Sequence, residues 1–273
     1  MNAKHVPHRF ARCSAAALLA IAAAPFASAH HDVVFPDGGE SLQPGQFVSI
    51  EWTVTIEHVL IDWDVFYSTT GDSGSLIPIR FGVDPGDPTV GSLHSIDWLV
   101  PDFPTANGRI MVRMNTVQMN YEFYSDADFT IEVALGNRSC AGQAANSSGS
   151  PAELHMVGSA SIAGNGLVLN VSSLPANALG YPINSDTLGF AAMPGGSEGN
   201  LCLGGTIGRH ITQVTSSGAA GFVSIPIDLT VLPRAGATVA AIAGEVWRFQ
   251  YWTRDANPTS TSNFSDVVSV MLL

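Results

Sequence analysis

The chain has 273 residues, of which 46% are hydrophobic and only 12% are charged, and its formal net charge is −12. Such an acidic surface repels nucleic-acid phosphates and anionic lipid headgroups, so both are excluded as partners. The low charge content, with 27 glycines and 16 prolines, is typical of a turn-rich β protein and not of long solvent-facing helices.

Residues 1–29 have the three parts of a secretory signal peptide. The positive segment contains Lys4, Arg9 and Arg12. It is followed by the apolar stretch 15–26, which is too short to span a bilayer, and by the small residues 27–29 that a signal peptidase reads. We therefore expect cleavage after Ala29, a mature chain that begins at His30 without a membrane span, and a periplasmic, cell-surface or extracellular location.

Residues 30–134 are predicted to form an immunoglobulin-like β-sandwich. Apolar and polar residues alternate in about seven short segments that are separated by Gly, Pro and Asp turns, a pattern typical of this fold. The clearest runs are residues 48–54, 59–67, 96–100 and 110–114. Three tryptophans, Trp52, Trp63 and Trp98, fall at inward positions, which predicts that they pack in the core.

Residues 135–152 are rich in Gly, Asn, Ser and Ala and are predicted to be a linker. Alternating and apolar segments then resume, so residues 153–273 are predicted to form a second β-sandwich. Loss of the signal peptide leaves two cysteines, Cys140 and Cys202. An even pair in an exported protein predicts a disulfide, which fixes the linker to the second module.

Several segments of the first module match a known family: residues 35–40, 45–52, 64–68, 98–101 and 125–131. These segments resemble an immunoglobulin-like module of bacterial secreted proteins and of a fungal cell-wall-synthesis family, the KNH-like group. The resemblance covers nearly all of residues 34–133. It implies a β-sandwich that serves as an accessory or carbohydrate-associated module and not as a catalyst.

Other segments, in the second module, are residues 201–205, 207–209, 249–255 and 261–266. They look like an uncharacterised C-terminal β module of secreted bacterial proteins, and the resemblance implies no activity. The aromatic residues Tyr251 and Trp252 are interpreted as core. The alternative is that they form an exposed platform for a sugar ligand.

The sequence offers no supported catalytic set. Residues 71–74, Gly-Asp-Ser-Gly, look like the nucleophile segment of chymotrypsin-like proteases, but too few residues precede Ser73 to form the barrel that carries the base and the acid. A hairpin loop is the better interpretation. Asp84 and Asp87 lack the ligand spacing of a dedicated calcium loop, so a solvated turn is expected there.

The histidines provide the one chemical clue. Cleavage after Ala29 gives His30 a free α-amine, which can chelate copper together with its imidazole, and a second histidine completes a T-shaped site of three nitrogens. His58 and His94 are the candidates for the second histidine, with His31 beside them. This arrangement occurs in secreted lytic polysaccharide monooxygenases and in some periplasmic copper carriers. The alternative is that these histidines are only turn, terminal and core residues.

The leading hypothesis is therefore an exported, non-catalytic binding or structural protein of the cell surface or extracellular space, with no cofactor and with polysaccharide or another surface component as its partner. The alternative is a copper-binding protein that uses His30 with His58 or His94. Such a protein would act as a carrier or, as a third possibility, as an oxidative enzyme.

Overall fold

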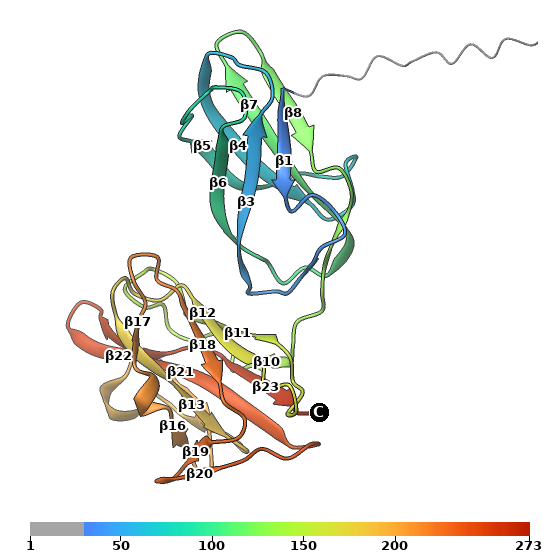
Figure 1. Cartoon of the computed structure of the whole chain (residues 1–273). Coiled ribbons are helices and arrows are strands. Elements are labelled where there is room, and N and C mark those ends of the chain that lie inside the picture. The colour runs from blue at the N-terminus through green and yellow to red at the C-terminus, as the bar shows by residue number, and fades with distance from the viewer. Residues whose placement is uncertain (1–29) are drawn as a thin grey trace, which may run out of the picture.

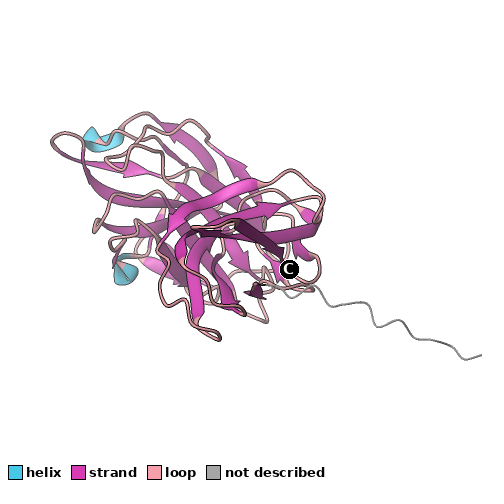
Figure 2. Cartoon of the chain, turned by 90° about the horizontal axis from the view of Figure 1, so that it is seen from above, coloured by secondary structure: helices cyan, strands magenta, loops and turns pink. Residues whose placement is uncertain are grey.

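A computed structural model describes residues 30–273 as two β-rich modules, and the expected signal peptide, residues 1–29, lies outside the described residues (Figure 1). Figure 2 shows from above that strands account for nearly all of the regular structure. The helices of this part of the chain are two three-residue 3-10 turns, η1 (Pro194–Gly196) and η2 (Ile211–Gln213), and neither could cross a membrane. The predictions of an all-β chain and of two tandem sandwiches are confirmed.

The first module consists of a three-stranded sheet with the order β1-β3-β6 and a six-stranded sheet with the order β2-β9-β7-β4-β5, in which β8 also pairs with β7. Its strands are β1 (His31–Phe35), β2 (Ser41–Leu42), β3 (Phe47–Val54), β4 (Leu60–Ser68), β5 (Ile77–Val83), β6 (Leu93–Leu99), β7 (Thr105–Thr116), β8 (Asn120–Tyr124) and β9 (Phe129–Ile131). The two sheets enclose one hydrophobic core.

Alternation along the strands builds this core. In β3 every second residue is buried, because successive side chains of a strand point to opposite faces of the sheet. Trp52 from β3 and Trp63 from β4 are both fully buried, and their rings meet edge to face with centroids 5.6 Å apart. Trp98 is also buried, as the sequence predicted.

The second module packs a seven-stranded sheet, with the order β10-β23-β21-β13-β16, against the three-stranded sheet β11-β12-β18. In the larger sheet β17 also pairs with β13, and β22 also pairs with β21. Two hairpins, β14–β15 and β19–β20, complete it. Its strands are β10 (Asn137–Ser139), β11 (Glu153–Gly158), β12 (Leu167–Ser172), β13 (Leu179–Ser185), β14 (Leu188–Ala191), β15 (Leu201–Leu203), β16 (Gly208–Arg209), β17 (Thr215–Ser216), β18 (Val223–Ile227), β19 (Leu232–Arg234), β20 (Ala237–Val239), β21 (Val246–Ala256), β22 (Ser260–Phe264) and β23 (Val267–Met271).

The predicted disulfide between Cys140 and Cys202 is present. It lies in a small hydrophobic cluster on the outer face of the large sheet, beside Phe264 and Val267. The expected linker is shorter than the sequence indicated, because residues 137–139 form β10 and pair with β23. An ion pair at 2.6 Å between Arg138 and Asp266 adds to this pairing. The polar residues 137–139 therefore form a strand at the edge of the sheet, where the disulfide and an ion pair hold them.

The modules touch through the loop between β2 and β3. The Gln43 side chain accepts a hydrogen bond from the Gly158 N–H at 2.6 Å and donates one to the Gly158 carbonyl at 3.1 Å. The Asn170 amide donates to the Gly45 carbonyl at 2.9 Å. Nearby, the rings of Phe47 and Phe222 lie 4.7 Å apart.

Candidate functional site

Two of the predicted histidines meet at one end of the first module. The Nδ1 atom of His30 lies 2.6 Å from the Nε2 atom of His58, so one ring N–H donates to the other ring's lone pair. Their ring centroids are 4.8 Å apart and their planes differ by 28°. If the rings were stacked face to face, their centroids would not be separated by the nitrogen–nitrogen distance plus one radius of each ring, as they are here. The rings therefore meet edge to edge. The two ring nitrogens therefore point at each other.

The fold brings these histidines together by returning the β3–β4 loop to the start of β1. The backbone N–H groups of Thr55 and Ile56 both donate to the His30 carbonyl at 3.1 Å. The next residue, His31, is fully buried, and its ring hydrogen-bonds the Val112 carbonyl at 2.7 Å. Because neighbours on a strand point to opposite faces, burial of His31 directs His30 to the surface. These contacts hold the loop that leads to His58 against the start of β1.

Tyr121, on β8, covers one side of the pair. Its ring is nearly parallel to that of His30, at 3.8 Å and 14°, and lies 4.8 Å from that of His58 at 27°. These separations place the tyrosine over the gap between the two imidazoles, nearer to His30. Sequence reasoning missed this residue, because no local pattern indicates that β8 lies beside the start of β1.

The electrostatic surroundings favour a cation. The first module, residues 30–134, contains sixteen Asp and Glu residues against three Arg, and the second module contains seven against five. Partial burial and the neighbouring His58 lower the pKa of the His30 imidazole, so the ring stays neutral and its lone pair is available at neutral pH. Strongly acidic surroundings also raise the local concentration of cations.

A cavity of about 730 Å³ adjoins the histidine pair. It is lined by Glu57, His58, Val59, Leu60, Pro85, Gly86, Pro88 and Gln118. The site therefore opens to solvent on the His58 side, where a ligand or a partner could reach it.

His94 does not join this site, which corrects one of the two candidate pairings. In the three-stranded sheet β1-β3-β6, it lies on the strand two positions from β1 and pairs with Trp52. Its Nε2 hydrogen-bonds the Asp87 carbonyl at 3.0 Å, and its ring packs on Trp52 and Trp63. Within residues 30–273, no group of three or more His, Cys, Asp or Glu side chains could hold a metal. A third nitrogen would have to be the His30 amine.

The sugar platform of Tyr251 and Trp252 is also corrected. Tyr251 is only 1% exposed, and its burial raises the pKa of its phenol. Trp252 is partly exposed on the opposite face of β21, since adjacent strand residues cannot share a face. Its ring neighbour is Tyr181, directly across the β13–β21 pairing, with centroids 5.0 Å apart.

The hydrolase-like serines belong to ordinary loops. Residues 195–199 have the spacing Gly-x-Ser-x-Gly, which the sequence reasoning overlooked. The Ser197 side chain, however, is buried, and its hydroxyl donates to the Ser262 carbonyl at 2.9 Å, in a loop that follows a 3-10 turn.

The Asp84 and Asp87 carboxylates accept backbone hydrogen bonds within their own turn, as expected of a solvated turn.

No family model and no curated protein matches the chain, so the resemblance of residues 34–133 to KNH-like modules stays a prediction. Among solved structures, the fibronectin(III)-like modules of CbhA from Clostridium thermocellum match with a TM-score of 0.25 and 10% sequence identity, over 89% of this chain and 93% of that chain. A TM-score this low establishes neither a shared fold nor a shared function. The fold assignment therefore rests on the sheets described above.

Proposed function

We propose that the chain is an exported copper-binding protein whose mature form begins at His30 and binds one Cu²⁺ ion through the His30 amine, the His30 Nδ1 and the His58 Nε2. The observation that carries this proposal is the convergence of the two ring nitrogens at 2.6 Å on the first residue after the predicted cleavage site. The role is binding or carriage, in keeping with the absence of a supported catalytic set in the sequence.

The donor set selects copper on chemical grounds. Three nitrogen ligands in or near one plane suit Cu²⁺, which prefers square-planar or tetragonal geometry and stands highest in the affinity order of the divalent first-row metals. Metal–imidazole bonds are about 2 Å long. Binding must therefore replace the hydrogen bond between the rings and widen the gap to roughly twice that length. Both rings are partly exposed, so a small rotation is sufficient.

Tyr121 limits the coordination of this ion. Its ring covers one side of the histidine plane, and the cavity beside His58 gives the site an opening to solvent. A protein that carries copper needs such an opening for transfer. An oxidative enzyme would use the same opening for oxygen, but it would then release peroxide when supplied with reductant, and a peroxide assay separates the two roles.

The test uses the mature chain that begins at His30, titrated with Cu²⁺ and followed by calorimetry and EPR. We expect one equivalent to bind, with an EPR signal that shows nitrogen coupling. His58→Ala should weaken the affinity by roughly a hundredfold or more, since even outer-shell partners typically contribute 10–100-fold. A chain that begins one residue earlier, at Ala29, moves the amine away from His30. Its copper affinity should fall by about as much as that of His58→Ala.

His94→Ala is the matched control, because it removes a partly exposed histidine of the same module that lies outside the pair, and its affinity should stay that of the unchanged chain. Tyr121→Phe should keep the EPR parameters, whereas Tyr121→Ala should alter them by uncovering one side of the ion. Equal copper affinity in the unchanged chain and in His58→Ala would contradict the proposal. So would an exported form whose intact mass shows a first residue other than His30.

A further inference from the structure

We propose a second ligand site in the C-terminal module: a groove beside Trp252 that binds a linear anionic polysaccharide of the polyuronate class. The site lies on a different module from the histidine pair and does not depend on copper. It uses one of the two residues of the predicted sugar platform, but with a different aromatic partner and with an arginine.

The first part of the groove is an aromatic cavity of about 250 Å³. Its lining includes Tyr181, Trp252, Phe264 and Arg209. The rings of Tyr181 and Trp252 are both partly exposed and are tilted by 43° to each other. The apolar C–H face of a pyranose ring packs well on such aromatic faces. The cavity is of a size suited to about one sugar ring.

Unpaired polar groups line this cavity. No other described residue hydrogen-bonds the Tyr181 hydroxyl or the Trp252 indole N–H. Arg209 is exposed, and no carboxylate of residues 30–273 forms an ion pair with it. A guanidinium without a partner recognises carboxylate in a bidentate manner. Aromatic stacking beside a free arginine therefore fits a sugar that carries a carboxylate.

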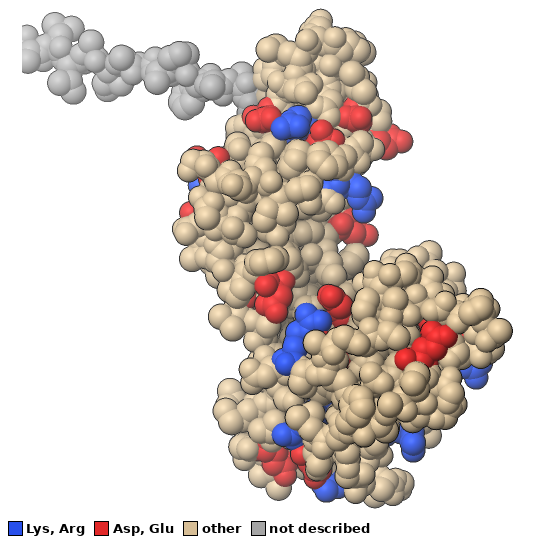
Figure 3. All heavy atoms as spheres, turned by 180° about the vertical axis from the view of Figure 1, so that it is seen from behind, with Lys and Arg blue, Asp and Glu red and all other residues tan. Residues whose placement is uncertain are grey.

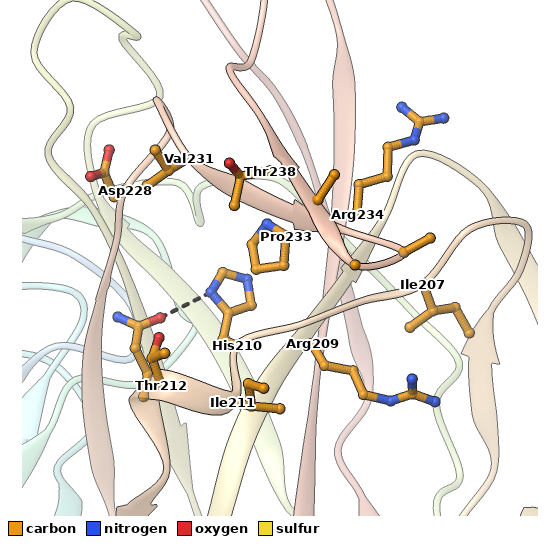
Figure 4. Close-up of a pocket in the computed structure, with 14 residues that line it drawn as sticks. Ile207, Arg209, His210, Ile211, Thr212, Asp228, Val231, Pro233, Arg234 and Thr238 are labelled. Carbon is orange, nitrogen blue, oxygen red and sulfur yellow. Dashed lines mark hydrogen bonds between the residues drawn. The ribbon is translucent and has the colours of Figure 1, made fainter.

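A second, larger cavity of about 890 Å³ continues from the first, and the two share Ile207 and Arg209. Figure 4 shows Arg209 and Arg234 extending to the same side of this cavity, away from His210, with Ile207 between them. Arg234 pairs with Asp186 at 2.6 Å, so it adds less free positive charge than Arg209. Two adjoining cavities with arginine at their junction fit several consecutive residues of a chain and not an isolated sugar.

The distribution of charge opposes an anionic ligand much less on this module than on the first. Five of the eight arginines of residues 30–273 lie in the second module. Acidic residues exceed basic residues by only two in the second module, but by thirteen in the first. Figure 3 shows, on one face, few charged side chains scattered among wide uncharged areas. A polyanion is thus repelled by the first module and tolerated by the second.

The test measures binding of alginate hexamers to the mature chain without copper, by calorimetry at low and at physiological salt, with cellohexaose as the neutral probe. We expect alginate to bind, cellohexaose to bind at least tenfold more weakly, and salt to weaken the alginate complex. Arg209→Ala and Trp252→Ala should each weaken alginate binding by tenfold or more, with circular dichroism confirming that the variants are folded.

Two control variants separate this site from general charge and from the copper site. Arg254→Ala removes an exposed arginine of the same module that lies outside both cavities, and it should change the affinity by less than twofold. His58→Ala should leave alginate binding unchanged whether or not copper binds. Equal binding by Arg209→Ala and the unchanged chain, equal affinity for both hexamers, or no alginate binding would each overturn the proposal. If Trp252→Ala does not fold, Tyr181→Phe replaces it in the test, because this variant keeps the aromatic ring and removes only the hydroxyl.

Discussion

At the scale of single residues, burial determines which histidines can act as ligands. His30 and His58 are partly exposed and direct their ring nitrogens at each other. His31 and His210, by contrast, are buried, and each keeps one ring nitrogen without a hydrogen-bond partner among the described residues. Burial disfavours the charged imidazolium, so the pKa of the His210 ring lies below its usual value.

His210 is expected to make the second module sensitive to acid. Because its pKa is lowered in the folded state, the unfolded chain binds more protons as the pH falls below about 6.5. The stability that the neutral ring contributes is present above that pH and is lost as the pH falls through the folded-state pKa. His210→Asn keeps a polar group near Gln213 but does not titrate, so its free energy of unfolding should fall less between pH 6.5 and pH 5. Urea unfolding at several pH values measures this difference. Parallel pH dependences in the two proteins would contradict it.

At the scale of elements, β10 shows how a polar segment becomes a strand. Its three residues, Asn137–Ser139, contribute little to the core, since none of them is fully buried. The strand is held instead by pairing with β23, by the ion pair between Arg138 and Asp266, and by the disulfide at Cys140 that follows it directly. Its position depends more on these links than on its own hydrophobicity.

The disulfide is expected to stabilise the second module strongly. The two cysteines are 62 residues apart, and closing a loop of this length restricts the unfolded chain. Replacing both Cys140 and Cys202 by Ser should lower the free energy of unfolding by about 2–4 kcal/mol. Chemical denaturation with and without a reductant measures this loss in the free energy of unfolding. Reduced wild-type protein should match the double variant, and a reductant effect that persists in the double variant would contradict this account.

At the scale of the whole molecule, the contact between the modules depends on a glycine. Gly45 has a φ of +77°, and a Cβ atom there would lie 2.2 Å from the His155 Cβ of the second module. Close approach at this point allows the hydrogen bond from Asn170 to the Gly45 carbonyl. The relative position of the modules is therefore sensitive to a single methyl group.

Gly45→Ala is expected to separate the modules. Gly39→Ala is the matched control, because Gly39 also has a positive φ, of +82°, but a Cβ there meets no atom within 4 Å. Both variants should lose about 1–2 kcal/mol of first-module stability through the left-handed backbone. Only Gly45→Ala should increase the radius of gyration in small-angle X-ray scattering. An unchanged scattering curve for Gly45→Ala would show that the contact does not set the arrangement.

The sequence by itself determined those features that depend on local pattern and composition. Alternation predicted the strands and the burial of Trp52 and Trp63, because a strand has a period of two residues and one face must leave water. The pairing of Cys140 with Cys202 followed from there being only two cysteines after the predicted cleavage. The all-β class followed from the composition, which is rich in turn residues and poor in charged residues.

Only the tertiary structure decided which distant residues meet. His58 and His94 were equal candidates in the sequence, and the return of the β3–β4 loop to β1 brought only His58 to His30. Strand register paired Trp252 with Tyr181, 71 positions earlier in the chain, and turned Tyr251 into the core. Sequence patterns specify the face on which a side chain lies. Its neighbours on that face depend on the register and order of the strands, which arise from contacts far apart in the chain.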